Sequence, residues 1–351
     1  MAALWADNFQ AYGTDPAFLL NGIYAGNGCT LVDDPDPLVT QTVCFLGIFF
    51  SGLRKVLPAS KTGIVGVAAR FWFAGLPSGG GVNIPGIIAF NDAANTNNVS
   101  IAVTSTGAIQ VSRGPVNGGT ILGTSAPVLV SNAFNHVEAL VKCNNTTGSI
   151  QVYVNGISIL NLTAIDTAVT LEECSQINFS SANGFDGTPR ADVYMRDLFI
   201  WDDTGALNNS VAGTVNVISL VPTSDNSLNW APSTGTTGFD ILDNSPPVDT
   251  IYIGAVTPPP SPAKFNMSNL PANVTSVRTL MTLVRAGKSD SGDGSLRNAL
   301  ISGASTGLGV DRPITQPFTY YSDIFETDPA TAAAWTPGAV DAVVMQLNRT
   351  L

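Results

Sequence analysis

The chain has 351 residues, with 15 Lys or Arg against 26 Asp or Glu, so its formal net charge is −11. Nucleic acids and anionic membranes are bound through basic patches, so this charge argues against both as partners. Charged residues make up 12 % of the chain, against about 25 % in an average protein, whereas 44 % of the residues are hydrophobic. This composition predicts a turn-rich, all-β protein with enough apolar side chains to bury a core.

Neither a targeting segment nor a membrane span is predicted. Residues 1–7 lack a basic stretch followed by an apolar one, so we expect no secretory signal. The longest apolar run, at 43–50, is far shorter than the roughly 20 residues of a membrane helix, and it predicts a buried strand. The cysteines lack the spacing of a zinc site, and in a protein made in a cytosol we expect buried free thiols at Cys29, Cys44, Cys143 and Cys174.

Alternating apolar and polar residues dominate the chain up to about residue 205. Asn155-Gly156 is a strong signal for a two-residue hairpin, because both positions require a positive φ. Short strands without a helix between them predict a β-sandwich. The predicted strands cover 66–73, 87–90, 99–104, 108–112, 136–143, 149–154, 157–162 and 191–201.

The second half of the chain also favours strands. We expect a hairpin of strands 277–285 and 295–301 around the turn 287–294, followed by a strand at 318–325. Thr336 before Pro337 predicts a helix N-cap followed by proline at the first helical position, and thus a short C-terminal helix. Residues 258–262 predict a polyproline loop.

Two segments of the sequence resemble known families. Asn135-His136-Val137, the hairpin around Asn155-Gly156 and the strand that ends at Asp202-Asp203 resemble concanavalin A-like lectin and laminin-G jelly rolls. The stretches at 215–225 and 328–336 resemble virion proteins of tailed phages, in which a smaller domain follows such a sandwich. The resemblances imply a lectin-type β-sandwich at 1–210 and a smaller β-rich docking or assembly domain with a short C-terminal helix at 211–351.

Catalytic candidates are few. Some lectin-like jelly rolls are glucanases with a Glu-x-Asp-x-x-Glu strand, and Glu326-Thr-Asp328 lacks the second Glu. Glu172 and Glu173 are adjacent, so in a strand they would point to opposite faces. His136, the only histidine, opens a predicted core strand, where packing and hydrogen bonding are the expected role. We therefore expect no enzymatic activity, and a polysaccharide-degrading enzyme is the minor alternative.

Carbohydrate binding is implied by the lectin resemblance. It requires aromatic rings beside polar side chains on loops or on an exposed sheet face. Trp72 and Trp201 lie in strongly apolar alternations and are expected in the core. The candidate ligand-binding residues are therefore two tyrosines on predicted strands and four asparagines in polar loops: Tyr153, Tyr194, Asn97, Asn98, Asn144 and Asn145.

No cofactor is expected, with calcium as the one candidate, because lectin and laminin-G sandwiches often hold it at a rim. Aspartate-rich turns supply oxygen ligands, yet none has the spacing of an EF-hand loop, and aspartate is also common in turns for conformational reasons. Residues 33–36 form one such turn. The candidate calcium ligands are Asp202, Asp203, Asp290 and Asp293.

Together these features predict a non-enzymatic structural protein on the surface of a tailed-phage virion, assembled in the cytoplasm of the host bacterium. A tail- or fibre-associated role in host attachment is the first interpretation, and capsid decoration or a head fibre is the alternative. A secreted bacterial adhesin is disfavoured because no signal peptide is predicted. The expected partners are other virion proteins, further copies of the chain in a symmetric assembly, and a host surface glycan.

Overall fold

The computed structural model describes residues 2–12, 23–25, 29–35, 42–46, 52–77, 86–180, 192–207, 209–244, 246–255 and 261–350. The chain forms two compact units, residues 1–217 and 218–351. The sequence places this boundary at 210/211. Residues 211–217 belong to the first unit because they pack on one of its sheets.

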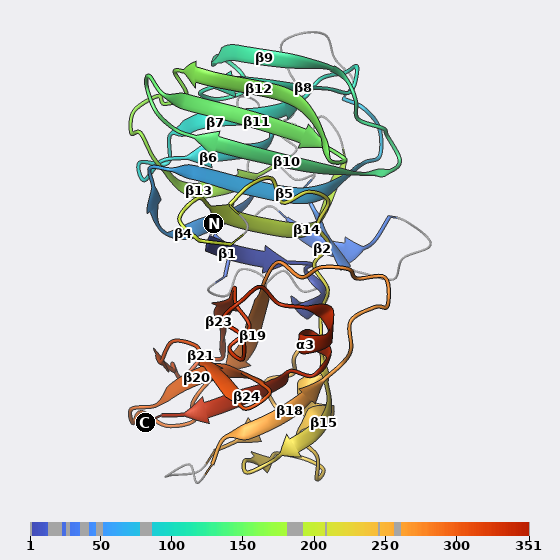
Figure 1. The fold of residues 1–351 in the computed structure, drawn as a ribbon, viewed down its shortest axis with the longest axis vertical. Helices are drawn as coiled ribbons and strands as arrows, with labels where there is room; N and C mark the ends of the chain where they lie inside the picture. Colours follow the sequence, from blue (N-terminus) through green and yellow to red (C-terminus); the bar gives the residue numbers. More distant parts are fainter. Residues whose placement is uncertain are drawn as a thin grey trace. The chain divides into compact units, whose positions relative to one another are not determined.

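The first unit is a sandwich of two antiparallel sheets (Figure 1). The eight-stranded sheet has the order β12 (Ile157–Ile165), β11 (Gly148–Val154), β10 (Phe134–Lys142), β5 (Ile64–Phe73), β14 (Val193–Asp202), β3 (Thr42–Phe45) and β2 (Thr30–Asp33), and β1 (Ala2–Asp7) also pairs with β14. The six-stranded sheet has the order β4 (Leu53–Lys61), β13 (Cys174–Phe179), β6 (Gly86–Asn91), β7 (Asn97–Val103), β8 (Ala108–Arg113) and β9 (Thr120–Pro127). A short 3-10 helix, η1, spans Gln10–Tyr12.

Alternating residues build the sandwich as predicted. In β10, Val137, Ala139 and Val141 are buried with other apolar side chains of the sandwich core, and the residues between them lie on the opposite face of the sheet. Asn155 and Gly156 have φ values of 51° and 81°, which confirms the two-residue turn between β11 and β12. The predicted all-β fold with a jelly-roll sandwich is therefore confirmed.

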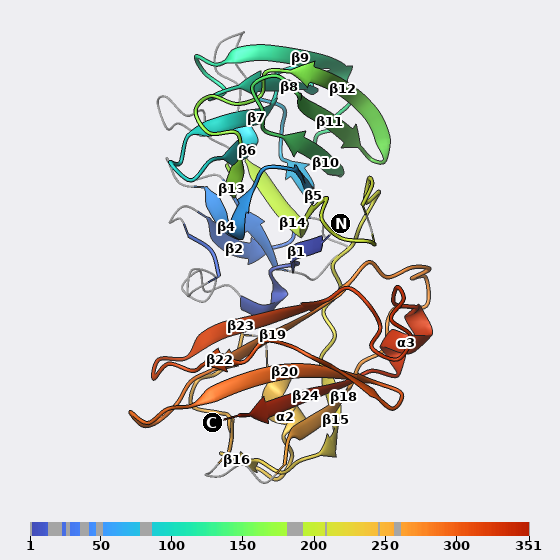
Figure 2. The same ribbon diagram turned by 60° about the vertical axis from the view of Figure 1, so that its left-hand side comes forward.

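The second unit packs a two-stranded ladder on a six-stranded sheet (Figure 2). The sheet has the order β15 (Pro222–Ser227), β18 (Ala263–Met267), β24 (Val344–Arg349), β20 (Ser295–Ser302) and β21 (Ser305–Leu308), with β22 (Arg312–Pro313) on β20. The ladder is β19 (Leu280–Ala286) with β23 (Thr319–Phe325), and a second pair is β16 (Ala231–Pro232) with β17 (Ile253–Gly254). Two short helices are α2 (Phe239–Leu242) and α3 (Pro337–Asp341).

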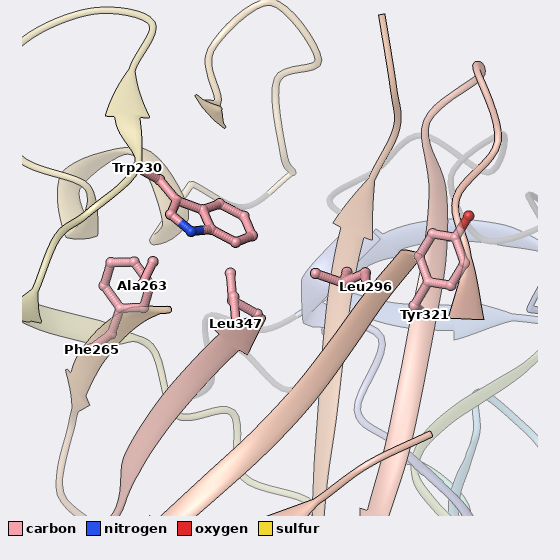
Figure 3. Packing of buried hydrophobic residues seen from close by; sticks show 6 residues of the cluster. All are labelled: Trp230, Ala263, Phe265, Leu296, Tyr321 and Leu347. Carbon is pink, nitrogen blue, oxygen red and sulfur yellow. The ribbon is translucent and has the colours of Figure 1, made fainter. Parts of the chain in front are cut away.

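The core of the second unit joins residues far apart in sequence. Trp230, Phe265 and Leu347 are buried in one cluster with Leu296 and Tyr321 (Figure 3). The Trp230 indole N–H donates to the carbonyl of Ser261 at 3.2 Å, so the ring is buried with its polar atom satisfied.

One expectation for this unit needs correction, and another is confirmed. The strands at 277–285 and 295–301 do not form a hairpin, because β19 pairs with β23 and β20 pairs with β24. Thr336 caps α3 as predicted, accepting from the Ala339 N–H at 3.2 Å, and β24, an interior strand of the sheet, follows the helix. The predicted polyproline loop lies mostly outside the described residues, as does the end of the apolar run after Leu46.

All four cysteines are buried with free thiols, as expected. Among the described residues, no helix has the length and apolar character needed to cross a membrane.

The packing of Trp201 on Gly66 yields a stability prediction. A Cβ on Gly66 would lie 2.1 Å from Cε2 of Trp201, whose side chain is 1 % exposed and has no room to retreat. We expect Gly66→Ala to lower the free energy of unfolding by about 3 kcal/mol, measured by urea denaturation. Gly75→Ala is the matched control, because a Cβ there meets nothing within 4 Å. Equal stability of the two variants would contradict the packing.

Candidate functional site

A row of three aromatic side chains crosses the outer face of the eight-stranded sheet, the face turned away from the six-stranded sheet. The strand register sets Trp72 on β5 opposite Phe134 on β10 and Tyr194 on β14. All three side chains are half-buried. The Trp72 and Phe134 rings are 5.3 Å apart in an edge-to-face arrangement. The face therefore presents partly open aromatic surface at this end of the three strands.

The next row along the strands is charged. Arg70 lies opposite His136 on one side and Arg196 on the other. The Arg196 guanidinium stacks 3.9 Å from the centre of the Phe134 ring and pairs with the buried carboxylate of Asp34. Two arginines are thus held directly beside the aromatic row.

Asp197 sits between the two arginines. Its Oδ2 lies 3.3 Å from Nε of Arg70 and 3.6 Å from Nε of Arg196. Burial raises the pKa of this carboxyl group, while a backbone N–H and the two arginines act in the opposite direction. Its φ of 54° marks a β-bulge, where the register of β14 against β5 shifts between Arg196 and Phe199.

Beyond the charged row, a segment of the chain without regular secondary structure covers the same face. Trp201 and Phe199 stack with ring centres 5.0 Å apart, and Ala212 packs in their cluster together with Leu140. We call residues 211–217 the strap. This segment follows β14 in the chain and runs over the neighbouring strands without forming a ladder of its own.

The strap is held by side chains of the sheet. The Glu138 carboxylate accepts from the N–H groups of Ala212 and Gly213 at 2.5 and 3.1 Å. Nε2 of His136 accepts from the N–H of Val215 at 3.3 Å, and Asp197 accepts from the N–H of Val217 at 3.0 Å. All of these acceptors belong to titratable groups.

His136 is packed and hydrogen-bonded, as the sequence predicts. Its side chain is buried beside Arg70 on the neighbouring strand. Burial and the Arg70 cation lower the pKa of the imidazole to about 4. The ring is therefore neutral at pH 7, with Nε2 free of a proton and able to accept from the strap.

The two predicted ligand-binding tyrosines lie on this outer face but in different surroundings. Tyr194 belongs to the aromatic row, where burial raises its pKa. Tyr153 packs against the Trp201 cluster, and its hydroxyl donates to Gln151 at 3.1 Å.

The predicted asparagines are engaged in loop and strand contacts. Asn98 is fully buried, its amide donates to the carbonyls of Leu171 and Glu173, and its Oδ1 accepts from Val169. Asn97 is the first residue of β7, where it lies opposite Asn91 of β6 in the six-stranded sheet.

Asn144 and Asn145 form a turn between β10 and β11. Oδ1 of Asn144 accepts from the N–H groups of Thr146 and Thr147, at 2.9 and 2.7 Å. Glu172 accepts from the side-chain amide of Asn144 and from the backbone N–H of Asn145. Asn97 and Asn98 lie in the six-stranded sheet, and the Asn144–Asn145 turn follows the end of β10 that is opposite to Phe134, so neither is beside the aromatic row.

Three of the four predicted calcium ligands make contacts within the protein. Asp202 is buried, pairs with Nζ of Lys61 at 2.7 Å and accepts from Thr204. Asp203 accepts from the N–H of Ile64, and Asp290 accepts from the N–H of Gly292. Asp293 is exposed in the same turn as Asp290. Over the described ranges, no group of three or more His, Cys, Asp or Glu side chains is placed to hold a metal ion.

Sequence reasoning missed Phe134 and the two arginines and placed Trp72 in the core. A signal was present, because Arg70 and Trp72 are two residues apart in one strand, as are Tyr194 and Arg196 in another. Side chains two apart share a face, so the pattern Arg-x-Trp beside Tyr-x-Arg marks one polar, aromatic sheet face.

No protein-family model and no curated protein matches the sequence. Several solved structures are distantly similar to part of the chain. An endo-β-1,4-glucuronan lyase from the fungus Trichoderma reesei is 12 % identical, with a TM-score of 0.38 over 57 % of this chain and 96 % of the other. The alginate lyase Aly36B is 16 % identical, with a TM-score of 0.39 over 56 % and 96 %. Domain 4 of an arabinanase from Geobacillus stearothermophilus, solved with arabinotriose, is 15 % identical, with a TM-score of 0.34 over 57 % and 92 %.

These comparisons correct one expectation. The sequence predicts a chain without enzymatic activity, because a glucanase carboxylate pattern is missing. Two of the similar structures are polysaccharide lyases, so that prediction is contradicted. A missing glucanase motif excludes one chemistry and leaves others open to the same fold.

The environment of His136 predicts a pH-dependent stability. The folded pKa of about 4 lies below the unfolded value of 6.5, so unfolding takes up a proton in this range. Above pH 6.5 the imidazole is neutral in both states and the free energy of unfolding has its full value. As the pH falls from 6.5 to 4, the free energy of unfolding decreases by at most about 3 kcal/mol. We expect His136→Gln to reduce this slope in urea denaturation at a series of pH values, and because the chain has one histidine, an unchanged slope would contradict the assignment.

Proposed function

We propose that the sandwich unit recognises carbohydrate on the outer face of its eight-stranded sheet, at the row of Trp72, Phe134 and Tyr194. The observation that carries this proposal is the aromatic row with two arginines fixed beside it. A sugar ring offers apolar C–H faces that pack on aromatic rings and hydroxyl groups that require directed polar partners. The row and its neighbours supply both.

Arginine pairing makes the site rigid. Asp34 and Asp197 fix both guanidinium groups, and the Phe134 ring supports one of them. Donors held in place before a ligand arrives lose little side-chain entropy on binding. Two arginines and two aspartates also balance in formal charge, so recognition would depend on stacking and hydrogen bonds more than on net charge.

Substitution of the row tests this proposal. We expect Trp72→Ala and Tyr194→Ala each to weaken glycan binding about tenfold, because each removes an aromatic surface worth about 1.4 kcal/mol. The measurement is binding to an array of bacterial O-antigens, capsular polysaccharides, and alginate and arabinan oligosaccharides, followed by calorimetry. Tyr252→Ala is the matched control, since Tyr252 is 47 % exposed and belongs to the second unit.

Three outcomes would decide whether the aromatic row binds carbohydrate. Loss of binding in both sandwich variants with the control unchanged supports the site. Equal binding by all variants places recognition elsewhere on the chain, and binding of no glycan by the wild-type chain refutes the proposal. Release of reducing sugars or of unsaturated products from a bound polysaccharide would add cleavage to recognition.

The setting of this recognition follows from the sequence resemblance. The segments of 211–351 that resemble tailed-phage virion proteins support a place on a virion surface, with the second unit contacting neighbouring virion proteins or further copies of the chain. Host attachment at the tail is the first interpretation and capsid decoration the alternative. A sugar-binding sandwich suits attachment better, because decoration requires no ligand.

Copy number separates the two placements. We expect purified particles to contain about a dozen copies of the chain, as the symmetry of a tail assembly implies, whereas decoration of a capsid lattice implies on the order of hundreds. Quantitative mass spectrometry of particles measures this directly, and a particle reconstruction locates the chain. Particles without the chain would refute the virion setting and leave the carbohydrate site to its own test.

A further inference from the structure

The strap satisfies the acceptors beneath it and leaves donors unsatisfied. Its N–H groups at Ala212, Gly213, Val215 and Val217 fill acceptors on Glu138, His136 and Asp197. Beneath it, Nδ1 of His136 and Nε1 of Trp201 are buried and have no hydrogen-bond partner among the described residues. A buried donor without an acceptor costs about 1–3 kcal/mol. The strap brings donors to a face that also needs acceptors.

Three small apolar side chains of the strap, Val211, Ala212 and Val215, pack on the Trp201 cluster. Of the strap residues, Ala212 is buried, Val211 and Val215 are half-buried, and Thr214 and Asn216 are exposed. The segment forms no backbone ladder with any strand. Its attachment therefore rests on these three small side chains and a few hydrogen bonds, each with a modest net contribution to stability.

We propose that the face beneath the strap is a covered extension of the carbohydrate site, in which Trp201, His136 and Glu138 bind further sugar residues once the strap is displaced. This inference rests on the proposed function, because it extends the aromatic row along the same strands. The aromatic row, the charged row and the covered part follow one another along β5, β10 and β14, and the register shift of β14 between Arg196 and Phe199 keeps Arg196, Phe199 and Trp201 opposite outward-facing residues of β5. A longer oligosaccharide along these strands passes from the open part to the covered part.

Sugar hydroxyl groups match the covered part in a way the strap does not. A hydroxyl both donates and accepts, so it can donate to the Glu138 carboxylate and accept from Nδ1 of His136 or Nε1 of Trp201. The Trp201 ring lies flat across Gly66, with ring atoms 2.1–2.4 Å from where a Cβ would stand. Displacement of Ala212 would open the Trp201 cluster for stacking.

A charge placed in the strap tests the inference. Ala212→Asp sets a second carboxylate beside Glu138, so repulsion should release the strap while the ligand-binding groups stay intact. Thr214→Asp is the matched control, because it adds the same charge at an exposed strap position. We expect amide exchange over 211–217 to become about tenfold faster or more in Ala212→Asp and to stay unchanged in Thr214→Asp.

Binding is then measured with disaccharides and hexasaccharides of the array polysaccharides. We expect Ala212→Asp to bind hexasaccharides about tenfold more tightly than the wild-type chain does, with disaccharide affinity unchanged, because only the longer ligand reaches the covered part. A released strap with unchanged or weaker hexasaccharide binding would overturn the inference. Disaccharide binding that still depends on Trp72 would leave the proposed function standing.

The wild-type chain supplies a second test that needs no variant to fold. Addition of a bound hexasaccharide should accelerate amide exchange over 211–217, because ligand and strap compete for one face, whereas a disaccharide should not. Slower or unchanged exchange with the hexasaccharide overturns the inference. If neither the wild-type chain nor Ala212→Asp binds any array glycan, the proposed function and this inference fall together.

Discussion

The bulge at Asp197 is the constraint on which the outer sheet face depends. A residue with a φ of 54° shifts the register of β14 against β5, so Arg196 and Phe199 both lie opposite outward-facing residues of β5 although they are three apart in sequence. The bulge separates an aromatic and charged half of the face from an apolar half around Trp201. The Asp197 carboxylate pairs with both arginines of the aromatic and charged half. It also accepts from the N–H of Val217, at the end of the strap that covers the apolar half. Positive φ is strained for most residues, and bulges often lie beside functional sites.

Several titratable groups on the outward face of the eight-stranded sheet are buried. Glu138, His136 and Asp197 face away from the sandwich core, yet all are buried because the strap lies over them. Buried charge is tolerated when hydrogen-bond partners replace water, and here backbone N–H groups of the strap and neighbouring arginines do so. The same arrangement makes the attachment of the strap depend on the protonation of His136, because a protonated imidazole has no acceptor left for the N–H of Val215.

Local pattern predicts the sandwich well and the connections poorly. The strand of Val137 and Ala139 and the turn at Asn155-Gly156 follow from alternation and positive φ, which depend on neighbours in sequence. The pairing of β19 with β23 does not, because the register depends on which distant strand buries the same apolar face. The bulge at Asp197 and the strap have no periodic signal at all. The aromatic row could be predicted in part, because Trp72 and Tyr194 each lie two residues from an arginine in a strand. Only the strand register shows that Trp72 and Tyr194 lie side by side.

Low charge and the site chemistry point to the same mode of recognition. The chain has a net charge of −11, yet the outer face pairs Arg70 and Arg196 with Asp34 and Asp197. A ligand approaching this face meets no strong field, so attraction from a distance contributes little to the rate of association. Selectivity must then arise in contact, from ring stacking and from donors and acceptors fixed by the ion pairs. Such recognition tolerates changes in salt, because paired and partly buried charges are screened less than exposed ones.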